Sequence, residues 1–96
     1  MADLASIKAT VHGRVTGIGF RAFVRTQAMS LGLTGYARNL PAESTVEIES
    51  EGERARLEEL IAYLRVGPPL ARVERVEVKW SGYAGRYSDF SIRAKY

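Results

Sequence analysis

The chain contains no cysteine and a single histidine, His12. Without thiols it can form neither a disulfide framework nor a thiolate zinc site, and it has no cysteine nucleophile. A single histidine also excludes a His-rich metal cluster within one chain. A serine triad would depend on His12, which we expect to have a structural role within a strand. These absences remove most of the familiar covalent and zinc-dependent chemistries.

Long apolar runs are also absent. No stretch approaches the roughly 18 apolar residues of a membrane span. The first residues, 1–6, carry Asp3 and lack the basic region and apolar run of a signal peptide. Neither the P-loop motif G-x-x-x-x-G-K-[ST] nor the dinucleotide fingerprint G-x-G-x-x-G occurs. The expectation is a soluble, cytoplasmic protein that uses neither a membrane nor a nucleotide-binding loop.

Charge is balanced rather than concentrated. The chain has 14 basic and 11 acidic residues, for a net charge of +3, and the two signs alternate through residues 47–56 and 72–79. A nucleic-acid-binding protein usually carries a concentrated basic stripe. The glycine-rich segment that continues into Phe20 and Phe23 loosely resembles an RNA-recognition motif, but it runs into a predicted helix, where these rings would be buried. We therefore expect no nucleic-acid partner.

Length and composition predict one domain over residues 1–96. We expect it to act as a monomer, although neither length nor composition determines the oligomeric state. The chain is 96 residues long, with 46% apolar and 26% charged residues, which is typical of a globular domain. Alternating apolar residues predict strands at 7–12, 34–40, 45–50 and 76–80, with a short last strand at 90–92. Apolar residues at helical spacing predict helices over 21–31, with Gly32 as its stop, and over 53–66.

The order of these elements is β-α-β-β-α-β with a small extra strand. It predicts a ferredoxin-like α+β sandwich, in which two helices cover one face of a mostly antiparallel sheet. A turn over Pro41–Ser44 joins the second and third strands into a hairpin. In the third strand, Val46 and Ile48 are expected to face the core, and Glu47 and Glu49 are expected to face outward.

A glycine-rich loop, Gly13–Phe20, precedes the first predicted helix. Glycines allow successive backbone N–H groups to turn inward as a concave anion-binding nest. The helix N-terminus adds unpaired N–H donors and a partial positive charge, and the guanidinium of Arg21 matches phosphate oxygens. A solvated arginine here would oppose the helix dipole at a cost of about 0.3–1 kcal/mol, which favours a nearby anion. Together these features predict a site for a small phosphate-like dianion.

Asn39, late in the second predicted strand, is a candidate for orienting a water molecule. Its amide both donates and accepts hydrogen bonds without titrating. The alternative, a turn-forming asparagine before Pro41, is equally open from the residues alone. Arg14 is either a rim residue or part of the cradle, and Arg38 either faces solvent or pairs with a glutamate across the hairpin.

Several segments together resemble the acylphosphatase family. Residues 13–21, G-R-V-T-G-I-G-F-R, resemble its signature G-R-V-Q-G-V-G-F-R, and residues 35–39, G-Y-A-R-N, resemble its motif G-[WY]-[VA]-x-N. The segment G-P-P-x-A-x-V from Gly67 and the ending Y-x-x-F-x-I from Tyr87 also match. The chain departs from the family at Thr16, at Ile18 and in the Pro41–Ser44 turn. Because loop binding relies on backbone N–H groups, we expect binding to survive the first two changes.

The resemblance implies hydrolysis of the carboxyl–phosphate bond in acyl phosphates, with no metal and no organic cofactor. It implies that Arg21 holds the phosphate and that Asn39 orients the attacking water. The implied phosphate-binding residues form the loop: Val15, Thr16, Gly17, Ile18, Gly19 and Phe20. The competing hypothesis is a non-catalytic module that binds an acyl or carbamoyl phosphate within a larger assembly.

Overall fold

A computed structural model describes residues 3–42 and 44–94. Its elements, in chain order, are β1 (Leu4–Arg14), α1 (Phe20–Ser30), β2 (Thr34–Asn39), β3 (Thr45–Glu53), α2 (Arg54–Val66), β4 (Arg72–Gly82) and β5 (Phe90–Arg93). Every predicted element is present, although β1, β3 and β4 extend beyond their predicted ends. None of the described helices is both long and apolar enough to cross a membrane.

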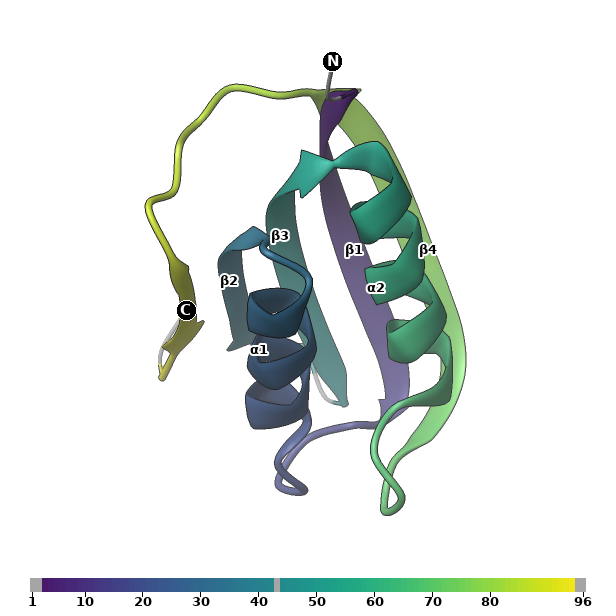
Figure 1. The fold of residues 1–96 in the computed structure, drawn as a ribbon. Coiled ribbons are helices and arrows are strands. Elements are labelled where there is room, and N and C mark those ends of the chain that lie inside the picture. Colours follow the sequence, from purple (N-terminus) through teal and green to yellow (C-terminus); the bar gives the residue numbers. More distant parts are fainter. Residues whose placement is uncertain (1–2, 43, 95–96) are drawn as a thin grey trace.

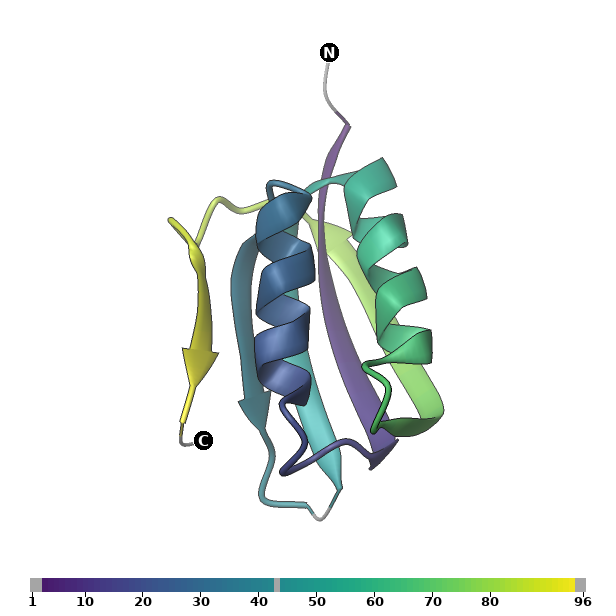
Figure 2. The ribbon, with the colours of Figure 1, turned by 60° about the horizontal axis from the view of Figure 1, so that its bottom comes forward.

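The five strands form one sheet in the order β4-β1-β3-β2-β5. All neighbours are antiparallel except β5, which runs parallel to β2 at the edge of the sheet. Both helices lie on the same face, α1 over the β2 side and α2 over the β1 and β4 side (Figures 1 and 2). This arrangement confirms the predicted ferredoxin-like α+β fold.

The core lies between the helices and this face of the sheet. Alternate residues of β1 and β3 point into it, as strand geometry requires. Helical spacing places three leucines of α2 on one buried stripe. The fully buried apolar residues of these three elements are Ala5, Ile7, Ala9, Val11, Val46, Ile48, Leu57, Leu60 and Leu64.

The opposite face of the sheet corrects one prediction. Glu47 and Glu49 do point away from the helices, but solvent does not surround them, and the Glu47 side chain is only 6% exposed. Glu47 accepts hydrogen bonds of 2.7 Å from both the Tyr36 hydroxyl and the Arg38 Nε. Burial would raise the pKa of the Glu47 carboxyl, but these two hydrogen bonds lower it below its ordinary value of 4.5. Arg38 thus pairs with a glutamate across the hairpin, one of its two predicted alternatives.

Two connections meet at one end of the sheet, the lower end in Figure 1. One is the loop between β1 and α1. The other is the turn that joins β2 to β3, which begins at Leu40, whose N–H donates to the Thr45 carbonyl at 3.0 Å. This confirms the predicted hairpin, although position 43 of the predicted turn lies outside the described residues. The fold therefore brings the glycine-rich loop and the end of β2 into proximity.

Candidate active site

The loop between β1 and α1 is anchored at both ends by buried side chains. Val15 is 1% exposed and Phe20 is 2% exposed. Between them, Thr16, Gly17 and Gly19 are exposed. Since the core holds the two ends, the backbone of the intervening residues is presented at the surface in a defined position.

The loop turns through two left-handed glycines before the helix begins. Gly17 has φ 73° and Gly19 has φ 76°, values that side-chain-bearing residues rarely adopt. Gly19 is the N-cap of α1, which has no side-chain cap and no acidic residue in its first turn. Within the described part of the chain, no acceptor pairs with the N–H groups of residues 16–22. Unpaired N–H groups and the positive end of the helix dipole together favour an anion.

Arg21, in the first turn of α1, adds a full positive charge beside these donors. Its Nη1 donates to the backbone carbonyl of Arg93 at 2.7 Å. Across residues 3–42 and 44–94, no carboxylate forms an ion pair with Arg21, whereas Arg38 and Arg86 are each paired with a glutamate. One edge of the guanidinium is therefore fixed, and its charge remains available to a ligand.

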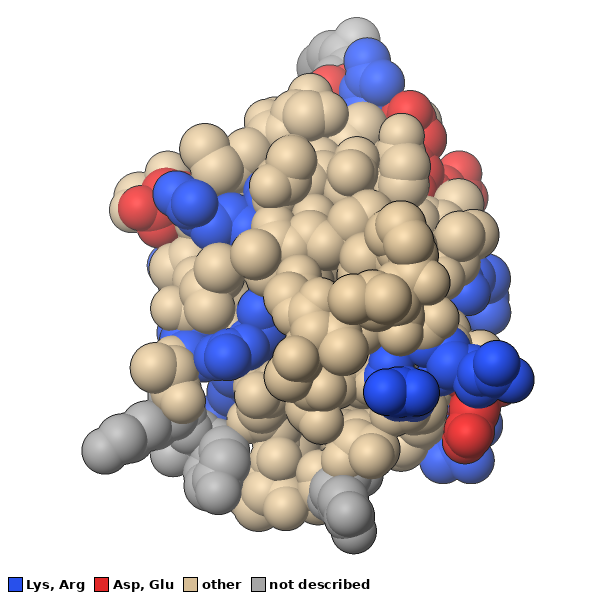
Figure 3. Space-filling view, turned by 90° about the horizontal axis from the view of Figure 1, so that it is seen from below, with Lys and Arg blue, Asp and Glu red and all other residues tan. Residues whose placement is uncertain are grey.

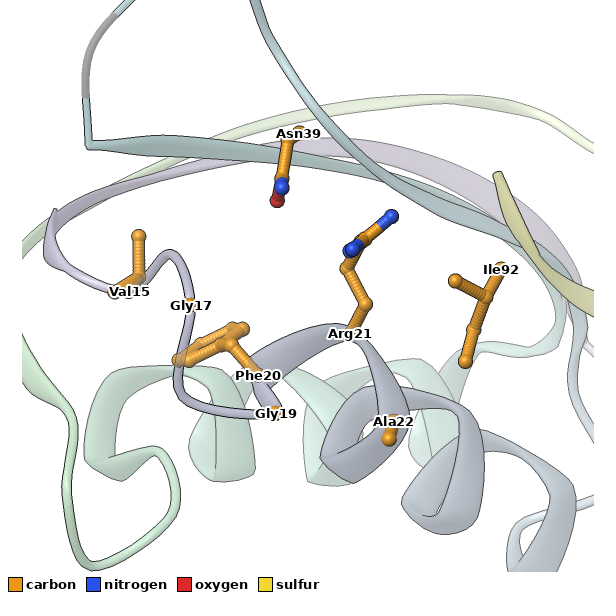
Figure 4. Close-up of a pocket in the computed structure, with 8 residues that line it drawn as sticks. All are labelled: Val15, Gly17, Gly19, Phe20, Arg21, Ala22, Asn39 and Ile92. Atoms are coloured by element: carbon orange, nitrogen blue, oxygen red, sulfur yellow. The ribbon is translucent and has the colours of Figure 1, made fainter. Parts of the chain in front are cut away.

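Asn39 ends β2 on the face of the sheet that the helices cover. Figure 4 shows its amide pointing toward the loop, while the Arg21 guanidinium rises from the helix toward the same space. The two side chains line one hollow of about 150 Å³, smaller than the roughly 300–1,000 Å³ typical of sites for drug-sized ligands. The full lining is Val15, Gly17, Gly19, Phe20, Arg21, Ala22, Asn39 and Ile92.

Other residues singled out from the sequence lie elsewhere. The side chains of Thr16 and Ile18 do not line the hollow, and Ile18 packs partly against the core. Arg14 lies in a separate depression with His12 and Arg75, so it is not part of the hollow at Arg21. His12 hydrogen-bonds Glu77 at 2.7 Å, consistent with a structural role.

Two lining residues had no functional signal in the sequence. Ala22 follows Arg21 and carries no chemistry of its own. Ile92 matched an apolar strand pattern, but its place beside the hollow depends on β5 pairing with β2, which local pattern does not reveal. The one sequence signal for Ile92 was the Y-x-x-F-x-I motif that begins at Tyr87 and ends at Ile92.

Charge at this end of the molecule is mostly positive. Figure 3 views the molecule from below, where Lys and Arg side chains lie in groups on either side of an uncharged centre, with fewer Asp and Glu side chains. Such a field attracts anions to the surface and raises their association rate. The hollow itself contains one charged side chain, that of Arg21.

The lining restricts the chemistry that this arrangement can perform. None of the eight residues carries a carboxylate, imidazole, amine, thiol or phenol, so no lining side chain is an ordinary general base or covalent nucleophile. The available functions are hydrogen-bond donation, positive charge and the orienting amide of Asn39. These suit the binding of a tetrahedral oxyanion and the positioning of a water molecule.

Known proteins are similar to this chain in sequence and in fold. The family model described as Acylphosphatase matches residues 7–92. An acylphosphatase of Dehalococcoides mccartyi (strain ATCC BAA-2266 / KCTC 15142 / 195) is 51% identical over 87 residues, covering 91% of this chain and 96% of that protein. The crystal structure of acylphosphatase from Bacillus subtilis matches with a TM-score of 0.88 at 31% identity, over 93% of this chain and 98% of that one. The T. kodakarensis HypF structure matches with a TM-score of 0.81 at 33% identity, over 96% of this chain but 12% of that one.

Proposed function

Because this chain belongs to the acylphosphatase family and is an acyl phosphate hydrolase, we propose that the hollow between the glycine-rich loop and β2 is its active site. Arg21 and the N–H groups of the loop hold the phosphate, and Asn39 orients the attacking water. The observation that carries this proposal is the convergence of Arg21, Asn39 and an uncapped helix N-terminus on one small hollow. All of these groups come from one chain, so the proposed site needs no second copy.

The reaction is a displacement at phosphorus. The water oxygen forms a bond to phosphorus as the bond between phosphorus and the carboxyl oxygen breaks. The carboxylate leaves with the bonding electron pair, and the proton lost by the water moves to a phosphate oxygen. The products are a carboxylate and inorganic phosphate. Because a carboxylate is a weak base, it leaves without a general acid, which matches a lining that has no carboxyl, imidazole, amine, thiol or phenol side chain.

In the proposed reaction, most of the rate enhancement comes from stabilising the negative charge on the phosphate oxygens. Phosphoryl transfer depends on positioning and on stabilising the charge spread over the equatorial phosphate oxygens. The loop N–H groups and Arg21 are preorganised donors aimed at that charge, so they need little rearrangement during the reaction. The proposed reaction uses no metal ion, and phosphate release should be unchanged by a chelator.

The test is phosphate release from a synthetic acyl phosphate by the wild type, Arg21→Ala and Asn39→Ala. Loss of Arg21 should lower turnover by about 100–1,000-fold, the usual cost of removing one preorganised donor. Asn39→Ala should lower turnover while leaving the affinity for inorganic phosphate nearly unchanged. Arg65→Ala, in the exposed last turn of α2, is the control for losing one arginine.

Near-normal turnover by Arg21→Ala would refute its proposed role. For Asn39, weaker phosphate binding with unchanged turnover would contradict water orientation.

The family comparisons favour the hydrolase over the competing hypothesis, a non-catalytic module. The observation in favour of the module is the match to T. kodakarensis HypF, in which the matched part is only 12% of the chain. A module would bind one equivalent of acyl phosphate without releasing inorganic phosphate. Multiple turnovers per chain in the same assay would exclude it.

A further inference from the structure

Arg93, near the end of β5, contacts two parts of the molecule at once. Its backbone carbonyl accepts the 2.7 Å hydrogen bond from Arg21 Nη1. Its guanidinium carbon lies 3.8 Å from the centre of the Tyr36 ring, on the face of the sheet opposite the helices. One residue therefore joins Arg21 on the helix side to an aromatic ring on the other side.

The ring that Arg93 covers is itself fixed. Tyr36 is 4% exposed, and its hydroxyl donates to Glu47 Oε1 at 2.7 Å while also lying 3.1 Å from Glu49 Oε2. Burial and the neighbouring Glu47 raise the pKa of the Tyr36 phenol, so it remains a neutral donor. A cation above such a ring is attracted by the ring face. Tyr36 is therefore a rigid platform.

The strand that carries Arg93 is short and lies at the edge of the sheet. β5 has only four residues and pairs on one side, with β2. A short edge strand is easily displaced at its ends. The other described hydrogen bond between β5 and α1 is longer, 3.3 Å, and runs from Arg25 Nε to the Phe90 carbonyl at the opposite end of the strand. The stack on Tyr36 secures the end of β5 that accepts the hydrogen bond from Arg21.

We propose that Arg93 is a positioning residue, whose stack on Tyr36 holds its carbonyl where it orients the Arg21 guanidinium toward the phosphate. This inference rests on the phosphate-binding role proposed for Arg21. A guanidinium has five N–H donors in a rigid fork. Fixing Nη1 on a carbonyl orients the remaining donors before a ligand arrives, which lowers the entropic cost of binding.

The experiment compares Arg93→Ala with the wild type in steady-state hydrolysis of a synthetic acyl phosphate and in competitive inhibition by inorganic phosphate. Arg93→Ala should weaken phosphate inhibition and lower kcat/KM by roughly tenfold, since a misplacement of ~1 Å can cost ~100-fold. Arg54→Ala is the matched control. Its guanidinium also stacks on an aromatic ring, Trp80, at 4.8 Å, but it begins α2 at the other end of the molecule (Figure 1). Both kinetic values should be unchanged in the control.

Three further measurements separate positioning from loss of charge or loss of fold. The loss of kcat/KM in Arg93→Ala relative to the wild type should persist at high salt. High salt screens long-range charge interactions, so a loss caused only by the missing charge would disappear. In the Arg21→Ala background, adding Arg93→Ala should change the residual activity little, because its effect passes through Arg21. Thermal unfolding checks the fold, and Arg93→Lys takes the place of Arg93→Ala in every assay if the alanine variant is unfolded.

Wild-type kinetics for Arg93→Ala, or an equal loss with and without Arg21, would overturn the inference. So would recovery at high salt. Normal turnover by Arg21→Ala would instead refute the proposed function, so the two failures are distinguishable.

Discussion

Among the arginines of the described chain, Arg21 differs in what surrounds its charge. Arg38, Arg54, Arg56 and Arg86 each lie within 3.1 Å of a carboxylate oxygen. Arg21 instead donates to a carbonyl and faces a hollow at a helix N-terminus, where its charge opposes the dipole. A bound dianion would satisfy both the helix end and the guanidinium. Other described arginines, such as Arg25, also lack a carboxylate partner, so the residue-scale signature of an anion site is the combination of an unpaired guanidinium, a hollow and an uncapped helix N-terminus.

Arg21→Lys tests whether charge or shape matters at this position. Lysine keeps the charge but presents one ammonium, which cannot bond the Arg93 carbonyl and grip a phosphate edge as a fork does. We expect kcat/KM for a synthetic acyl phosphate to fall between the values of the wild type and Arg21→Ala. Arg65→Lys, in the last turn of α2, serves as the control. Full activity in Arg21→Lys would show that a point charge suffices.

At the scale of elements, the decisive unit is the loop that joins β1 to α1. Its buried ends, Val15 and Phe20, fix its position, and its left-handed glycines set its path. A Cβ built at Gly19 would meet no atom within 4 Å, so the cost of a side chain there comes from backbone conformation alone. Loop shape and helix N-terminus are therefore open to test without steric damage.

Gly19→Ala should destabilise the protein by about 1–2 kcal/mol, the penalty for a left-handed residue with a Cβ. The loop path should shift as the strain is relieved, so phosphate inhibition should also weaken. Urea unfolding and the inhibition constant for inorganic phosphate measure the two effects. Gly82→Ala is the control, because its Cβ also meets nothing and its φ is not in the left-handed range. If both variants behave alike, the loop path does not depend on Gly19.

The spacing of apolar residues predicted the helices and strands well because it indicates which face of each element is buried. The α2 stripe of Leu57, Leu60 and Leu64 and the alternation around Val46 and Ile48 are direct consequences of core packing. The same pattern could not predict what covers the opposite face. Glu47 alternates as a solvent-facing residue would, but Tyr36 and Arg38, from the partner strand, cover it.

The candidate site was predictable where its chemistry belongs to side chains in sequence motifs. Arg21 and Asn39 were identified in this way, and the fold brings them to one hollow. The carbonyl of Arg93 was not, since every residue has a carbonyl and sequence gives no sign of which one will meet a guanidinium. Its contact depends on β5 lying beside β2, although paired residues of the two strands, such as Gly35 and Phe90, are 55 positions apart in the chain.

The whole molecule has a sheet with two different faces. Helices and apolar side chains cover one face, and carboxylates, arginines and tyrosines cover the other. The buried carboxylate of Glu51 accepts hydrogen bonds from the N–H groups of Ala84 and Arg86, which ties the segment before β5 to this face. Polar interactions therefore hold the segment that leads into β5, the strand that contacts Arg21.

The free energy of unfolding should fall in acid, partly because the Glu47 carboxylate becomes protonated. Because folding lowers the pKa of this carboxyl below 4.5, the folded state binds fewer protons than the unfolded state near that pH. Its contribution is complete at neutral pH and is lost as the pH falls through the lowered pKa. Urea unfolding at a series of pH values should show a shallower acid decline for Glu47→Gln than for the wild type. Parallel pH profiles would contradict this assignment.

The proposed function requires that an oxyanion binds between Arg21 and the loop that joins β1 to α1. A titration of the isotope-labelled protein with inorganic phosphate, followed by NMR of backbone and side-chain N–H groups, tests it most directly. The largest shifts should occur at the N–H groups of residues 16–22, at the Arg21 guanidinium and at the Asn39 amide. Shifts centred instead on the separate basic depression of His12, Arg14 and Arg75 would contradict it.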